Sequence, residues 1–217
     1  MKTDAQLQQD VLAELKWDPS INAAQIGVEV KNGVVTLAGH VDSYAEKWDV
    51  EQVAQRISGV QTLAIEIDVT LPGTSKRNDS DIARSAKDVL RWMVNLPKDG
   101  VKIMVENGWI TLSGEVDWEY QRNAASSAVR NLMGVTGVSD DIALKPTVSL
   151  SAVKSDIEAA LKRAAQIDAQ NISVAVQGNE VTLSGKAHSW AERELAKNSA
   201  WAAPGVRNVV DNMTVAI

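Results

Sequence analysis

One short pattern occurs three times along the chain, and it constrains the fold more than any other feature. Residues 33–41, 108–116 and 179–187 each contain a strand-like run built around Thr-Leu-x-Gly. The copies are 75 and then 71 residues apart. Because repetition at a nearly fixed period indicates that one structural unit recurs, the chain is expected to fold as three similar modules in series.

Each copy is expected to form the second strand of a β-hairpin. Asn32-Gly33 and Asn107-Gly108 open the first two copies, and Asn-Gly favours a tight turn between antiparallel strands. The third copy has the reversed pair Gly178-Asn179, which also tolerates positive φ. Branched residues occupy every second position of the strand before each turn, which predicts that one face of that strand is buried.

The segments around each hairpin complete a helix–strand–strand–helix–strand unit. Leu7, Val11 and Leu15 recur on one face of a first helix, and Ser43 and Ser189 begin capping boxes that open second helices. A final alternating strand follows each second helix. The predicted division is three modules at residues 1–71, 79–145 and 151–217, joined by linkers at 72–78 and 146–150.

Glycines recur at fixed places in the unit and are interpreted as structural. They are expected at the hairpin turn, at the end of the Thr-Leu-x-Gly pattern and after the second helix, where a left-handed residue ends a helix. The set is Gly33, Gly39, Gly59, Gly108, Gly114, Gly134, Gly185 and Gly205.

Composition excludes several classes of function. There is no cysteine, so disulfides and thiolate chemistry are absent. The net charge is −6, and the whole excess lies in residues 1–71, with 5 basic and 11 acidic residues; such a chain is not expected to bind nucleic acid. The first residues contain no apolar leader, and no transmembrane segment is expected. A cytoplasmic location follows if the chain is complete, and a periplasmic one if it is a processed form.

The repeated unit resembles the BON domain, a bacterial family named for osmotically induced and nodulation proteins. The likeness rests on the hairpin, the Gly-x-Val-x-Leu-x-Gly run, a helix with spaced alanines, and Gly-Val before the last strand. It implies an α/β fold (an α+β sandwich) in which two helices pack on one face of a three-stranded mixed sheet. It also implies a non-enzymatic binding protein of bacterial stress, osmotic response or envelope homeostasis. The resemblance leaves three kinds of ligand open: phospholipid, client proteins bound in a chaperone-like role, and potassium or a small ligand. It implies no cofactor.

Neither histidines nor carboxylates form a recognisable catalytic or metal site. His40 and His188 occupy non-equivalent positions of the repeat and are expected at the surface. Asp140 and Asp141 could contribute oxygen ligands to a cation, but a turn or edge-strand role is the favoured interpretation. No catalytic residue is therefore predicted.

Aromatic residues supply the candidate recognition surface. The chain has 7 Trp and no Phe. Trp17 and Trp92 end equivalent first helices and are expected to cover the core. Another set is expected to face outward, on the second helices or on the outer face of the middle hairpin. This set is either packed between modules or available to a partner, and the pattern leaves the oligomeric state open. It comprises Tyr44, Trp48, Met104, Trp109, Trp190 and Trp201.

Overall fold

The structure is a computed structural model that describes residues 2–145, 157–160, 171–203 and 206–215. The first module contains α1 (Asp4–Trp17), a 3₁₀ turn (Ala23–Gln25), β1 (Ile26–Lys31), β2 (Val34–Val41), α2 (Tyr44–Gln55) and β3 (Thr62–Val69). The second contains α3 (Asp79–Trp92), β4 (Val101–Glu106), β5 (Trp109–Val116), α4 (Glu119–Arg130) and β6 (Gly137–Leu144), after a short 3₁₀ turn (Gly73–Ser75). The third contains a helical stretch at 157–160, β7 (Ile172–Gln177), β8 (Glu180–Ala187), α6 (Trp190–Trp201) and β9 (Asn208–Val215).

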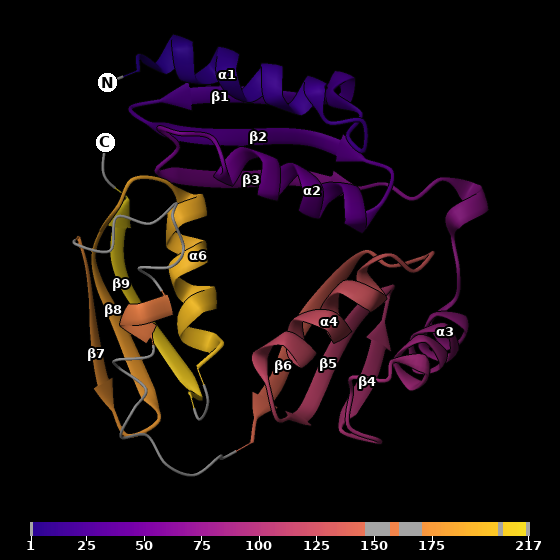
Figure 1. Cartoon of the computed structure of the whole chain (residues 1–217). Coiled ribbons are helices and arrows are strands. Elements are labelled where there is room, and N and C mark those ends of the chain that lie inside the picture. Colours follow the sequence, from indigo (N-terminus) through magenta and orange to yellow (C-terminus); the bar gives the residue numbers. More distant parts are fainter. Residues whose placement is uncertain (1, 146–156, 161–170, 204–205, 216–217) are drawn as a thin grey trace.

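Each module has one three-stranded mixed sheet, which confirms the predicted α+β fold (Figure 1). The strand that carries the Thr-Leu-x-Gly pattern lies in the middle. In the first module it pairs antiparallel with β1, Val28 opposite Leu37, and parallel with β3, Leu37 opposite Ile65. The other two sheets repeat this register at equivalent residues. A common register means that the same faces are buried in all three modules.

A carboxylate at the start of the first helix fixes the hairpin turn. Asn32 and Gly33 both have positive φ, as the tight turn requires. Their N–H groups donate to the Asp4 carboxylate over 2.8 and 3.1 Å. Asp79 accepts the equivalent bonds in the second module, both at 2.8 Å. The turn and the first helix are thereby held together in both modules.

The glycine that ends the Thr-Leu-x-Gly pattern is required by close backbone packing. A methyl group on Gly39 would lie 2.1 Å from the carbonyl oxygen of Gln25, and φ there is +139°. A methyl group added to Gly114 or Gly185 would also lie too close to a backbone carbonyl oxygen, at 2.2 and 2.0 Å. Gly205 and the predicted linker 146–150 lie outside the described residues.

Three separate hydrophobic cores fill the modules. Each is centred on two inward residues of the middle strand, and Val35 and Leu37, for example, are completely buried. The prediction that Trp17 and Trp92 cover these cores is wrong, because they are 83% and 84% exposed. Each lies two positions after the buried leucine that ends the inward face of its helix, and two residues turn about 200° around a helix.

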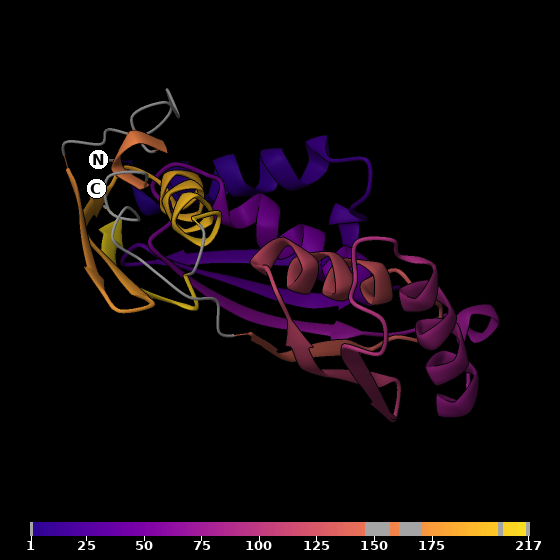
Figure 2. The same ribbon diagram turned by 60° about the horizontal axis from the view of Figure 1, so that its bottom comes forward.

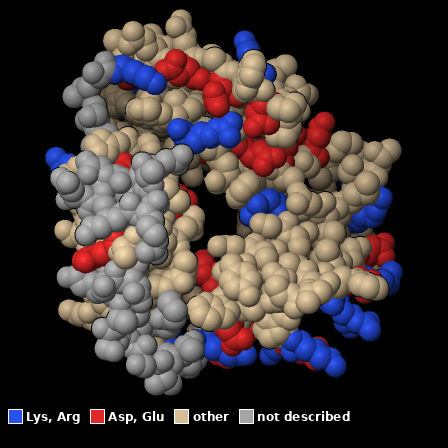
Figure 3. All heavy atoms as spheres, in the orientation of Figure 1, with Lys and Arg blue, Asp and Glu red and all other residues tan. Residues whose placement is uncertain are grey.

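The modules are arranged with their second helices turned toward one another. In Figure 1, α2, α4 and α6 lie toward the middle of the molecule, while α1, α3 and β7 lie at its border. In the turned view, the strands of the first module run across the middle of the molecule (Figure 2). The space-filling view shows an opening between the modules, with charged residues at its border (Figure 3). In the described part of the chain, every helix is too short or too polar to cross a membrane.

Candidate functional site

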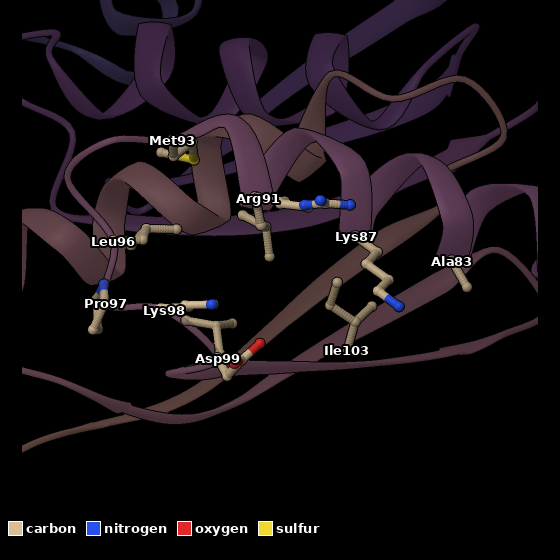
Figure 4. A pocket seen from close by; sticks show the side chains of 11 residues that line it. Ala83, Lys87, Arg91, Met93, Leu96, Pro97, Lys98, Asp99 and Ile103 are labelled. Carbon is tan, nitrogen blue, oxygen red and sulfur yellow. The ribbon is translucent and has the colours of Figure 1, made fainter.

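The second module contains an apolar groove between its first helix and its edge strand. Leu90 and Met93 come from α3 and its end, Leu96 from the following loop, and Val101 and Ile103 from β4. The groove has a volume of about 670 Å³. It lies beside β4, which pairs with β5 on one side only, so the groove is a feature of the sheet edge (Figure 4).

Basic side chains surround this groove. Lys87 and Arg91 project from α3 and Lys98 from the loop, with Asp99 as the acidic neighbour (Figure 4). Residues 82–103 contain five basic and two acidic residues. The equivalent residues of the first module, 7–28, contain one basic and three acidic residues. An apolar floor with a cationic rim suits a ligand that is both hydrophobic and anionic.

Two large apolar side chains project beside the groove. Trp92 is 84% exposed, and Val94 is fully exposed at 101%. Trp92 ends α3 and Val94 begins the following loop, which is held at two points: Met93 N–H donates to the Leu90 carbonyl over 3.2 Å, and Gln121 Nε2 donates to the Asn95 carbonyl over 2.7 Å. Fixed and exposed apolar side chains beside lysine and arginine are typical of segments that insert into a membrane surface.

Four of the six aromatic and Met positions singled out from the sequence lie at contacts between modules. Tyr44 packs against the core of the second module, and Trp190 against the core of the first. The Arg130 guanidinium lies over the Trp48 ring, 3.7 Å from its centre. The Arg122 guanidinium lies 5.3 Å from the centre of the Trp201 ring.

The contact between the first and second modules also brings charges together. Burial lowers the pKa of Arg130 from its usual value, while Tyr44, Asp49 and Glu51 of the first module oppose that shift. Burial raises the pKa of Glu51, against the opposing effect of Lys47 and Arg130. Arg130 therefore connects the modules through both its ring contact and its charge.

The other two positions lie on the outer face of the middle sheet. Met104 is 59% exposed and Trp109 is 48% exposed. Trp109 Nε1 donates to Ser139 Oγ over 2.9 Å, and its ring lies over Gly137. These two side chains therefore belong to a single module, and they are separate from the four aromatic side chains that lie at contacts between modules.

The histidines and the acidic pair have ordinary structural surroundings. Both histidines are exposed, as predicted, and His188 Nδ1 lies 3.0 Å from Glu192 Oε2. Asp140 accepts hydrogen bonds from Ser126 Oγ at 2.6 Å and from Ile142 N–H at 3.1 Å. Among the residues that the structure describes, no group of three or more His, Cys, Asp or Glu side chains could hold a metal ion.

Sequence reasoning missed the groove and its basic rim. Taken over the whole second repeat, residues 72–145, basic and acidic residues balance at ten each. This average conceals the excess of positive charge at residues 82–103. A charge count over about a third of each repeat, compared between equivalent segments such as 7–28 and 82–103, would have located the rim.

Comparison with known proteins gives one curated relative and several distant structural neighbours. Osmotically-inducible protein Y of Escherichia coli is 28% identical over 146 residues, which cover 65% of this chain and 73% of that protein. The C-terminal domain of CdsD, from the type III secretion system of Chlamydia trachomatis, is 15% identical over the whole of both chains, with a TM-score of 0.27. The periplasmic domain of PrgH from S. typhimurium is 15% identical over 89% of this chain and 95% of its own, with a TM-score of 0.23. These structural likenesses are too distant to indicate a shared function.

The expectation of a cytoplasmic location is contradicted by the relationship to the E. coli protein, which is periplasmic. That expectation rested only on the lack of an apolar run in residues 2–6. A leader is removed from a mature exported protein, so its absence does not identify a compartment.

The family model for the BON domain matches three successive segments, residues 3–70, 78–146 and 149–217. Each segment contains the hairpin, the second helix and the parallel third strand described above. The chain therefore belongs to the BON domain family and carries three such domains in tandem.

Proposed function

We propose that this protein is a non-catalytic surface-recognition protein of the bacterial osmotic response in the periplasm, and that its second module binds membranes rich in anionic phospholipid. The relationship to the osmotically inducible protein Y supports the setting. The groove between α3 and β4 supports the ligand class, since it combines an apolar floor with Lys87, Arg91 and Lys98.

The observation that carries the proposal is the exposed pair Trp92 and Val94 beside that basic groove. Tryptophan suits the boundary between lipid headgroups and acyl chains, because its ring is largely apolar and its N–H is polar. Each lysine or arginine near an anionic membrane adds about 1 kcal/mol of attraction. The tip of the module, which is the exposed end of the first helix with Trp92 and Val94, supplies apolar contact, and the basic rim supplies charge. A peripheral membrane protein needs both contributions.

Vesicle flotation tests this proposal. The full chain should float with vesicles that contain phosphatidylglycerol and remain behind with pure phosphatidylcholine, and the binding should weaken as salt is raised. The double variant Lys87→Glu/Arg91→Glu should lose binding to the anionic vesicles.

A matched control separates local from overall charge. Lys16→Glu/Lys31→Glu makes the same change in net charge on the first module, at two exposed positions, and Lys16 is the equivalent of Arg91. It should bind nearly as the unaltered protein does. Equal losses in both double variants, or no flotation of the unaltered protein, would refute the proposal.

A second candidate function is chaperone-like binding of client proteins, favoured by the outer face of the middle sheet. Met104 and Trp109 are half exposed there, on neighbouring strands. If this face binds clients, Met104→Glu should abolish suppression of aggregation of a heat-denatured test protein, measured by light scattering. Flotation with anionic vesicles should be unchanged in that variant.

A further inference from the structure

A second cleft lies between α4 of the second module and α6 of the third. Trp118, Tyr120 and Asn123 line it from one side, and Asn198 and Trp201 from the other. Its volume is about 810 Å³, which lies within the range of roughly 300–1,000 Å³ that is usual for small-molecule sites. It shares no lining residue with the groove between α3 and β4.

Aromatic rings on both sides give this cleft flat apolar walls. Trp118 and Tyr120 lie at the start of α4 and are 37% and 57% exposed. Trp201 lies at the end of α6, where the Arg122 guanidinium packs over its ring. The face of an aromatic ring carries partial negative charge, so it attracts the slightly positive C–H groups on the flat side of a sugar ring.

A buried carboxylate in the wall lacks one hydrogen-bond partner. Glu119 lines the cleft and is 8% exposed. Its Oε1 accepts from Arg122 Nη2 over 2.7 Å, whereas its Oε2 is shielded from solvent and has no partner. Burial raises the pKa of this carboxyl, and Arg122 opposes the shift. An unpaired buried oxygen is unfavourable, so a ligand that donates a hydrogen bond to it would be favoured.

Charge in the cleft favours a neutral donor over a cation. Arg122 already pairs with Glu119, and the nearby Lys197 pairs with Glu194 over 3.0 Å, so both basic side chains are balanced by carboxylates. Asn123 and Asn198 contribute amide groups that both donate and accept hydrogen bonds. Hydroxyl groups match the carboxylate and both amides, while an ammonium ion would find the one carboxylate that lines the cleft already paired with Arg122.

We propose that the cleft between the second and third modules binds a neutral saccharide, whose ring stacks on Trp118 and Tyr120 and whose hydroxyl donates to Glu119. This inference does not depend on membrane binding by the second module, because the two sites are separate. It assigns a function to the contact between modules 2 and 3.

Isothermal titration of the full chain with maltotriose, cellotriose and N,N′,N″-triacetylchitotriose, all neutral, tests the proposal, with choline chloride as a cationic probe. At least one trisaccharide should bind, and choline should not. Glu119→Gln, which keeps the shape and removes the charged acceptor, should weaken binding about 10-fold. Tyr120→Ala removes an exposed stacking surface and should weaken it to a similar extent.

Trp92→Ala serves as the control, because Trp92 lies at the other site. It should leave saccharide affinity unchanged and reduce membrane binding, so the two proposals fail independently. Absence of binding by all three trisaccharides at millimolar concentration, preference for choline, or unaltered affinity in Tyr120→Ala would each overturn the saccharide assignment. Tyr120 is exposed, so that variant gives a result even if Glu119→Gln unfolds.

Discussion

The first and second modules can be compared residue by residue, because equivalent positions are separated by 75 residues without a gap. Asp4 and Asp79 bind the two turn amides in the same way. Trp17 and Trp92 end the first helices with almost equal exposure, 83% and 84%. A basic residue precedes each tryptophan, but the other surroundings differ: the first module has Glu14 and Asp18 where the second has the uncharged Val89 and Met93, and the second has Lys98 where the first has Ala23.

This difference separates the residues that specify the fold from those that specify recognition. The framework depends on alternating branched residues and a few glycines and aspartates, which are the same in both modules. The charges at the end of the first helix can vary, because none of those charged side chains is fully buried in the core. The same fold can therefore present an acidic tip in one module and a basic tip in the next.

The largest expected effect is on the shared framework. Gly39→Ala and Gly114→Ala should each lower the free energy of unfolding by about 3 kcal/mol, because a methyl group would meet a backbone carbonyl at positive φ. Denaturant unfolding of the full chain measures the loss. Gly73→Ala, in the linker with no atom near the added methyl, is the control. If one of the two motif variants were as stable as the control, the modules would not share this constraint.

The next effect tests whether charge alone distinguishes the two tips. A triple variant tests this by giving the first module the residues that the second module has at equivalent positions, Arg84, Ser85 and Lys98. The three changes are Gln9→Arg, Asp10→Ser and Ala23→Lys. They add two positive charges and remove one negative charge, and attraction to anionic vesicles should increase by about 2–3 kcal/mol. Flotation with phosphatidylglycerol vesicles measures the gain. Without a gain, the shape of the groove would have to account for the difference between modules.

Much of the fold was predictable because its signals are local. Asn32-Gly33 encodes a tight turn, and the alternation of Ile26, Val28 and Val30 encodes a strand with one buried face. The exposure of Trp17 was not predictable from residue type, because it depends on the angle around the helix. The contacts of Trp48 and Trp201 depend on how helices of different modules are placed, and no local pattern records that placement.

A smaller effect concerns the contact between the two modules. In the first module the second helix presents Trp48, and in the second it presents Arg130. A double-mutant cycle with Trp48→Ala and Arg130→Ala should give a coupling energy of about 0.5–2 kcal/mol, as expected for a partly buried cation–π pair. Thermal unfolding of the four proteins supplies the values. Strict additivity would show that the contact does not hold the modules together.

The smallest effect is expected for the stability of the two tips. Trp17→Ala and Trp92→Ala should each change the free energy of unfolding by less than about 0.5 kcal/mol, because both side chains are exposed. Denaturant unfolding checks this. A loss of several kcal/mol in either variant would mean that the tryptophan covers the core after all.

The same two variants test the central claim, that equivalent positions on one framework differ in function through their surroundings. The measurement is partitioning of Trp17→Ala and Trp92→Ala into phosphatidylglycerol vesicles, beside the unaltered chain. We expect Trp92→Ala to bind about 5- to 10-fold more weakly, through loss of roughly 1–1.5 kcal/mol of apolar contact, and Trp17→Ala to bind as the unaltered chain does. Equal losses in both variants, or no loss in Trp92→Ala, would contradict the account.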